Sequence, residues 1–149
     1  MYKRLIPLLM AFGLIAAACG SSGEVASVEA SSSDPVDISS AESEFGTLLV
    51  DGDGYTLYTF DVDERGSNVS TCTGPCIEQW PAVEEISVTS SSVSADLIGS
   101  FERSDGTIQA TYNGWPLYTF AGDDAPGDTN GQGFNQVWWL IDAQGELIS

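Results

Sequence analysis

The chain has 149 residues, with 4 Lys and Arg against 22 Asp and Glu, no His, and a formal net charge of −18 at pH 7. Phosphate binding needs clustered cations, so this composition argues against nucleic acid as a partner. Without histidine no Ser-His or Cys-His relay can form, and we expect a protein that is not an enzyme. Anionic lipid head groups would repel the chain, so membrane attachment must come from acyl chains.

The N-terminus has the pattern of an export signal. Two basic residues precede an apolar run over residues 5–18, which is too short to span a bilayer as a mature helix. Residues 16–19 read Ala-Ala-Ala-Cys, which resembles a bacterial lipobox. We therefore expect residues 1–18 to be a signal peptide and Cys19 to carry the lipid that anchors the exported domain to the bacterial membrane. The alternative is an ordinary signal peptide with an incidental cysteine.

A polar segment follows the signal. Residues 19–43 are rich in Ser, Ala and acidic residues, with only scattered valines. No apolar period typical of a helix or a strand runs through them, so we expect a disordered acidic linker that holds the domain away from the membrane. Residues 44–149 are then left as one domain with a modest core.

The remaining chain contains one unit twice. Residues 46–63 and 106–123 share eight identities over eighteen aligned positions without a gap. A register sustained over this length indicates a duplicated supersecondary unit, and two such units can bury a core that neither could build alone. We place repeat one at about residues 44–83 and repeat two at about 100–149.

Each repeat has a hairpin at its centre. Asp53-Gly54 and Asn113-Gly114 occupy matching positions, and both dipeptides favour the type I′ turn. The flanking segments are rich in Thr, Tyr, Phe and Leu, which suit strands. The outgoing strands carry apolar side chains on both faces, which indicates strands that lie between two layers or close into a small barrel. We predict an all-β domain in which two homologous hairpin-centred repeats pack into one small sandwich or barrel-like domain, with at most short helical turns.

The outgoing strand of each hairpin ends in a Tyr-x-Phe-x-x-Asp motif, with Tyr58, Phe60 and Asp63 in the first copy and Tyr118, Phe120 and Asp123 in the second. One interpretation is an aromatic platform for a sugar or another flat ligand, oriented by the carboxylate. The other is architectural: the aromatic rings fill a core between the repeats, and each Asp accepts backbone N–H groups of its loop. The duplication favours the architectural interpretation.

Two cysteines remain when Cys19 is set aside. Cys72 and Cys76 most simply form a disulfide, because they are an even pair in an exported protein. A redox pair or a copper(I) site are the alternatives. Redox centres usually depress a thiolate pKa with a nearby cation, and Arg65 is the only cation close in sequence.

The acidic loops are weak candidates for calcium. The segment from Asp61 begins like an EF-hand loop, but Arg65 stands at the fifth position and Cys72 at the place of the bidentate Glu. A site of another kind could be assembled from Asp123, Asp124 and Asp128. We expect no cofactor, with calcium as the one exception to test.

The motifs also resemble a known family, through both copies of Tyr-x-Phe-x-x-Asp, Cys72-x-x-x-Cys76 with Trp80-Pro81, Arg103-Ser104-Asp105-Gly106, Tyr112-Asn113-Gly114, and Gly127-Asp128 with Gly131-Gln132-Gly133. Together they cover residues 45–142. This pattern is similar to the secreted repeats of unknown function, bacterial lipoproteins marked by a Tyr-x-aromatic-x-x-Asp motif. Members often carry His where this chain has Trp115, and a second Pro where it has Ala82. The resemblance implies export and a two-repeat domain, and supplies no reaction.

These observations lead to one functional hypothesis and two alternatives. We expect an exported cell-envelope lipoprotein that binds an unknown ligand or envelope protein without catalysis. A redox or metal-handling accessory that uses Cys72 and Cys76 is the first alternative. A structural component of the envelope is the second.

Overall fold

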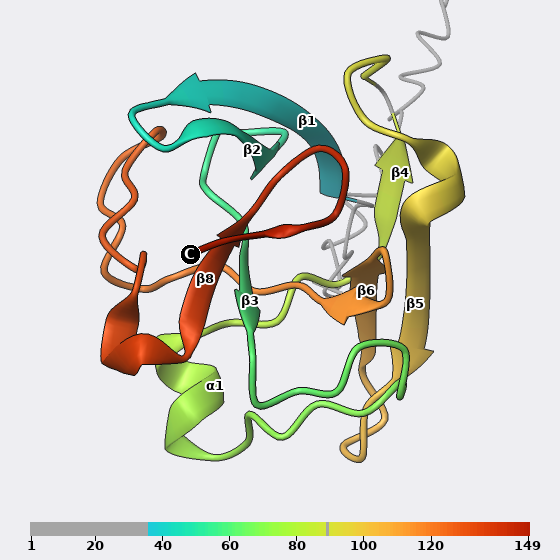
Figure 1. The fold of residues 1–149 in the computed structure, drawn as a ribbon. Coiled ribbons are helices and arrows are strands. Elements are labelled where there is room, and N and C mark those ends of the chain that lie inside the picture. The colour runs from blue at the N-terminus through green and yellow to red at the C-terminus, as the bar shows by residue number, and fades with distance from the viewer. Residues whose placement is uncertain (1–35, 89) are drawn as a thin grey trace, which may run out of the picture. The chain divides into compact units, whose positions relative to one another are not determined.

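The computed structural model describes residues 36–88 and 90–149 (Figure 1). The expected signal peptide, Cys19 and the spacer up to residue 35 lie outside these residues. The strands are β1 (Val36–Ser43), β2 (Gly46–Asp51), β3 (Tyr58–Phe60), β4 (Ile86–Val88), β5 (Ile98–Glu102), β6 (Ile108–Tyr112), β7 (Trp115–Pro116), β8 (Trp138–Ile141) and β9 (Leu147–Ile148). The helical turns are α1 (Pro75–Gln79), η1 (Ala95–Leu97) and η2 (Phe134–Gln136).

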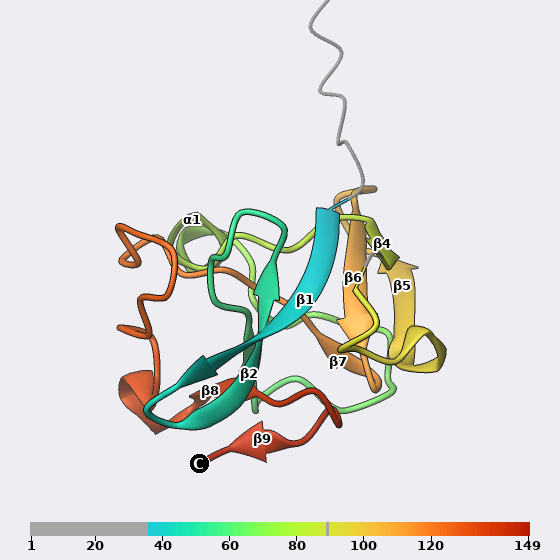
Figure 2. The ribbon, with the colours of Figure 1, turned by 90° about the horizontal axis from the view of Figure 1, so that it is seen from above.

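The strands form three small sheets, in the orders β2-β1-β4, β3-β8-β9 and β5-β6-β7. All neighbours are antiparallel except β1 and β4. In both views the sheet β5-β6-β7 lies on one side of the domain (Figures 1 and 2). The long strand β1 is strongly curved. The all-β prediction with short helical turns is confirmed. Over the described residues the sheets stay open and do not close into a barrel.

The hairpin of the second repeat has the expected turn. Asn113 and Gly114 take φ values of 50° and 82°, and Tyr112 pairs with Trp115 across the turn. Positive φ at both central residues is the signature of type I′. Asn113 tolerates this conformation better than most residues with a side chain, and Gly114 has no Cβ to clash.

The matching turn of the first repeat is different, and the type I′ prediction is wrong there. The N–H of Gly54 bonds to Asp51 O at 3.0 Å, and only Gly54 of this loop has positive φ, at 89°. Val50 is bridged to Thr56, so the loop holds one residue more than its counterpart. The Asp51 carboxylate accepts the N–H groups of Asp53 and Tyr55, which stabilises the longer loop.

The domain also begins earlier than the composition suggested. Residues 36–43, expected to belong to the disordered spacer, form β1, which pairs with β2 on one side and with β4 on the other. Ile38 of β1 is completely buried. The buried Ile38, the partly buried Ala41 and two backbone ladders stabilise a strand whose other residues are mostly polar, so its composition resembled a spacer.

Consecutive residues of the outgoing strands point into two separate cores. Leu57 and Leu117 lie in one cluster, which also holds Ile38, whereas Tyr58 and Tyr118 lie in the other. The predicted position of these strands between two layers is confirmed. Because the second cluster collects the aromatic residues of both repeats, it positions the candidate site.

Candidate functional site

The two repeats meet at the tyrosines of their Tyr-x-Phe-x-x-Asp motifs. Tyr58 N donates to Tyr118 O at 2.8 Å, and Tyr118 N donates to Tyr58 O at 3.0 Å, so the two residues form one antiparallel bridge. Both side chains are completely buried. The outgoing strands of the two hairpins therefore run side by side at the centre of the domain.

The motif side chains are exchanged between the repeats. Tyr58 Oη donates to Asp123 Oδ2 at 2.8 Å, and Tyr118 Oη donates to Asp63 Oδ2. Each Asp also holds its own loop, because Asp63 accepts the N–H of Thr71 and Asp123 accepts that of Asn130. The motif thus links each loop to the strand of the other copy.

Burial controls the ionisation of this network. Desolvation and the neighbouring carboxylates raise the pKa of Tyr58 and of Tyr118 well above the usual 10.0. Burial also raises the pKa of Asp123, although the hydrogen bond from Tyr58 opposes this. Both phenols therefore stay protonated hydrogen-bond donors at neutral pH.

The aromatic residues of the two copies form one continuous stack. Phe60 stacks on Trp138 with ring centroids 4.3 Å apart, Trp138 on Trp80 at 3.8 Å and 3°, and Trp80 on Phe120 at 4.3 Å. The two tryptophans are buried in the centre, and the two phenylalanines are half-buried at the ends. Phe60 and Phe120 are motif equivalents, so the stack follows the internal symmetry of the repeats.

An open cleft of about 310 Å³ lies beside this stack, lined by Phe60, Pro75, Cys76, Gln79, Trp80, Phe134, Asn135, Val137 and Trp138. One wall comes from α1 and the other from η2 and the start of β8. Asn135 and Gln136 take φ values of 53° and 62° in η2, a conformation uncommon for residues other than glycine. The cleft combines apolar ring surface with two exposed side-chain amides, Gln79 and Asn135.

The cysteine pair supports the α1 wall. Cys72 and Cys76 are joined by a disulfide, with Cα atoms 5.2 Å apart. Cys72 is buried, whereas Cys76 is half-buried and lines the cleft. Arg103 Nη2 donates to Cys72 O at 2.7 Å and Nη1 donates to Gln109, so a buried guanidinium ties this loop to the second repeat.

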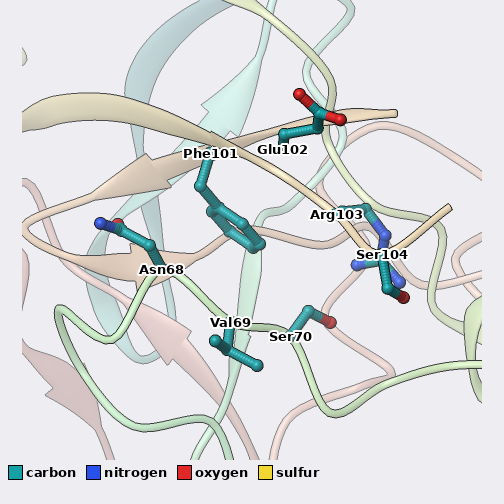
Figure 3. Close-up of a pocket in the computed structure, with 7 residues that line it drawn as sticks. All are labelled: Asn68, Val69, Ser70, Phe101, Glu102, Arg103 and Ser104. Atoms are coloured by element: carbon teal, nitrogen blue, oxygen red, sulfur yellow. The ribbon is translucent and has the colours of Figure 1, made fainter. Parts of the chain in front are cut away.

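A smaller pocket of about 140 Å³ lies on the other side of Arg103, lined by Asn68, Val69, Ser70, Phe101, Glu102, Arg103 and Ser104 (Figure 3). Ser70 Oγ is 2.7 Å from Tyr118 Oη, so its floor touches the buried network. The Glu102 carboxylate beside Arg103 makes it a poor anion site.

The acidic calcium candidates are not brought together as ligands. Asp123 points inward to Tyr58 and Asn130, while Asp128 Oδ2 accepts the N–H groups of Asp124 and Ala125. Among residues 36–88 and 90–149, no three His, Cys, Asp or Glu side chains are grouped so that they could hold a metal ion.

Sequence reasoning found Phe60 and the cysteines but missed most of the cleft. Phe134, Asn135 and Val137 follow the Gly131-Gln132-Gly133 motif of this loop but are not part of it. The usable signal was the tryptophan that follows the loop of each repeat. Trp80 and Trp138 occupy matching positions, two residues before the partners of Tyr118 and Tyr58, and their rings stack on each other.

A family comparison agrees with this two-repeat architecture. The family Lipoprotein_15, described as a secreted repeat of unknown function, matches residues 39–84 and 99–142. The chain belongs to this family. The first Lipoprotein_15 match begins inside β1 and the second inside β5, so each match contains one hairpin and one tryptophan of the stack. The resemblance inferred from the sequence motifs is confirmed. The family description states that the repeat is secreted and names no biochemical role.

No curated protein and no solved structure matches the chain significantly. None of the helices in the described part of this Lipoprotein_15 member is long and apolar enough to cross a membrane.

Proposed function

We propose that this protein is an exported cell-envelope lipoprotein whose domain binds a ligand or a partner protein, without catalysis, at the cleft beside the aromatic stack. The observation that carries the proposal is the open cleft of about 310 Å³ lined by rings from both repeats. Ligand sites are typically concave and mostly apolar, with a few polar groups that orient the ligand.

The cleft is preformed, which supports binding. Trp80 is buried and stacked on both faces, by Trp138 and by Phe120, so its ring has one position. The disulfide and Pro75 restrain the α1 wall. A surface that is already ordered loses little conformational entropy when it binds.

A binding role also fits what the polar motif residues do. Tyr58, Tyr118, Asp63 and Asp123 are occupied with one another and with loop backbone. They are buried, and the raised pKa values of both tyrosines keep their protons in place. The duplicated motif then builds the platform from which the cleft is made, and does not itself provide reactive groups.

The proposal also includes a lipid anchor at the N-terminal end of the mature chain. Lipid on Cys19 would hold the protein at the outer face of a membrane, and residues 20–35 would let the domain reach a partner within the envelope. Secretion is the family's own description. The Ala-Ala-Ala-Cys pattern of residues 16–19 supports the lipid.

The test is to map small neutral probes onto the mature domain. Indole and N-acetylphenylalaninamide, each titrated into the ¹⁵N-labelled domain, should shift the backbone signals of Gln79, Asn135 and Val137. Phe134→Ala should weaken this response, and Phe45→Ala is the matched control, because Phe45 is 41% exposed and outside the cleft. Shifts that gather around Phe101, or that spread evenly over the surface, would contradict the proposal.

A further inference from the structure

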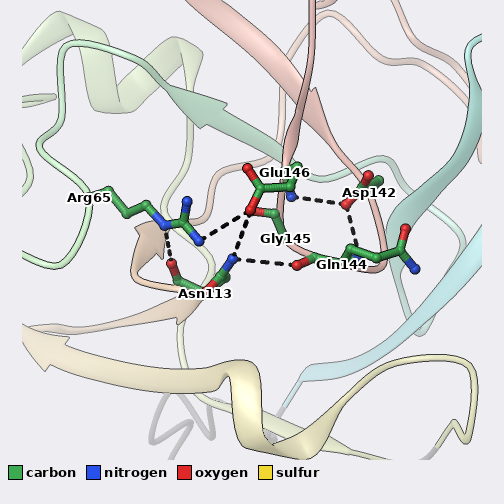
Figure 4. A network of polar contacts seen from close by, with 6 residues as sticks. All are labelled: Arg65, Asn113, Asp142, Gln144, Gly145 and Glu146. Atoms are coloured by element: carbon green, nitrogen blue, oxygen red, sulfur yellow. Dashed lines mark hydrogen bonds and ion pairs between the residues drawn. The ribbon is translucent and has the colours of Figure 1, made fainter.

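The cleft lies in a strongly acidic domain whose cations are already used. Residues 36–149 hold nineteen acidic residues and two arginines. Arg65 donates from Nε to Asn113 O at 2.8 Å and contacts Glu146 at 3.4 Å, in the network that joins the two turns of Figure 4. Arg103 is buried beneath the small pocket of Figure 3. No basic side chain of the described residues lines the cleft.

Two exposed carboxylates belong to residues that are next in sequence to residues lining the cleft. Asp61 follows Phe60, and its N–H bonds to Val137 O at 2.9 Å. Glu78 lies on α1 next to Gln79. An Asp61 oxygen accepts the Trp139 Nε1–H, and no Arg or Lys of the described residues forms an ion pair with Asp61 or Glu78. The cleft therefore lies in a negatively charged domain, and none of its lining residues is basic.

Aromatic rings flanked by carboxylates attract cations. A guanidinium or ammonium group is favoured over a ring face, and Arg also stacks flat on aromatic side chains. Phe60 and Phe134 are half-exposed and supply ring surface. Gln79 and Asn135 can each donate and accept, as a peptide backbone requires.

We propose that the occupant of the cleft is a basic segment of a partner protein, with an Arg or Lys side chain on the exposed rings, attracted by the negative charge of the domain, to which the nearby Asp61 and Glu78 contribute. This inference rests on the proposed function and names the class of partner. An open cleft suits an extended chain, whereas small-molecule sites enclose most of their ligand. A second copy of this domain is disfavoured, because two surfaces of the same strong charge repel each other.

The test uses the mature domain and three synthetic peptides that differ only in charge. An acetylated, amidated Gly-Arg-Leu-Arg-Gly peptide is compared with its citrulline analogue, which keeps the shape of arginine without the charge, and with its glutamate analogue. Tryptophan fluorescence and calorimetry report binding. The arginine peptide should bind most tightly, and its affinity should fall as salt rises, because its attraction to the acidic domain is screened.

Matched charge variants locate the site. Asp61→Asn with Glu78→Gln should weaken the arginine peptide about threefold to tenfold and flatten its salt dependence. Glu84→Gln with Glu85→Gln removes the same charge from exposed positions outside the cleft and should change affinity little. Far-UV circular dichroism confirms that both double variants remain folded.

The outcomes separate the inference from the proposed function. Equal binding of the citrulline peptide, or equal weakening by the two double variants, overturns the inference. If indole shifts the cleft signals and the arginine peptide does not, the binding module stands and the basic partner is wrong. If neither probe shifts them, both proposals fail.

Discussion

Tyr58 and Tyr118 donate their main-chain N–H groups to each other's carbonyl oxygens, at 2.8 and 3.0 Å. This reciprocal bridge places the equivalent strands of the two repeats against each other at the centre of the domain. Their phenols then reach the aspartates of the opposite copies, Asp123 and Asp63. A tyrosine and an aspartate are needed in both copies, because each repeat completes the other.

Removing one phenol oxygen should destabilise the domain substantially. Tyr58→Phe leaves Asp123 without its buried donor, and Tyr118→Phe does the same to Asp63. We expect each to lower the free energy of unfolding by about 1–3 kcal/mol, as an unsatisfied buried acceptor does. Urea denaturation measures this. Tyr55→Phe is the control, since the Tyr55 hydroxyl makes no hydrogen bond among the described residues. An equal decrease in the free energy of unfolding for Tyr55→Phe would contradict a stabilising role of the Tyr–Asp hydrogen bonds.

The same tyrosines should make the fold sensitive to alkali. The folded pKa of Tyr58 and of Tyr118 is raised above the usual 10.0. Below about pH 10 the folded and the unfolded chain both keep the phenol protons, so the free energy of unfolding does not depend on these groups. Above this pH the unfolded chain releases the protons while the folded chain retains them, so the free energy of unfolding falls as pH rises. Absorbance at 295 nm should show two tyrosines that ionise only on unfolding. The Tyr58→Phe, Tyr118→Phe double variant should lose this pH dependence.

The disulfide should contribute moderately to the free energy of unfolding. Cys72 and Cys76 close a loop of only five residues, for which chain entropy gives about 2 kcal/mol. Cys72→Ala with Cys76→Ala should lower the urea midpoint accordingly and broaden the signals of α1. Reduction of the unmodified protein should have a similar effect. No change in stability would mean that Arg103 and packing alone hold this loop.

Shortening the chain tests the boundary of the domain. A chain beginning at residue 44 lacks β1, which removes the buried Ile38 and leaves β2 and β4 without their shared neighbour. We expect no cooperative unfolding transition for it, whereas a chain beginning at residue 34 should melt normally. Ile38→Ala in the longer chain should cost about 2–5 kcal/mol. A folded chain from residue 44 would show that β1 is dispensable.

The lipid anchor can be tested in a bacterial host that processes lipoproteins. Cys19→Ser should abolish labelling by a clickable palmitate and release the protein from the membrane fraction. Lipidation adds hydrophobic burial that the acidic domain cannot replace. Cys72→Ser with Cys76→Ser is the control and should keep the label. Membrane retention of Cys19→Ser without label would indicate an ordinary signal peptide and another mode of attachment.

The first repeat shows where sequence reasoning reached its limit. Gly54 and Gly114 are aligned and both have positive φ, but only the second lies in a type I′ turn. The difference is a one-residue shift of the incoming strand, which pairs Val50 with Thr56 but Thr111 with Pro116. Pairing register depends on which side chains meet the core, so the aligned letters could not reveal it.

The boundary at residue 44 failed for a related reason. Ile38 is one apolar residue among polar neighbours, and such a pattern does not distinguish a strand from a spacer. β1 forms because β2 and β4, which are distant from each other in sequence, both offer it backbone partners. Segments stabilised by backbone pairing leave little trace in composition.

The duplication, the strand-rich class, the turn at Asn113-Gly114 and the cysteine pair could be predicted from the chain's residues, because each depends on local residue chemistry or on a repeated register. Tertiary structure alone decided that the motif tyrosines bind the aspartates of the opposite repeat. It also decided that Trp80 and Trp138 stack at the centre, beside a cleft completed by η2. These contacts join residues more than fifty positions apart, and their geometry follows from how two hydrophobic faces pack, which no local pattern encodes.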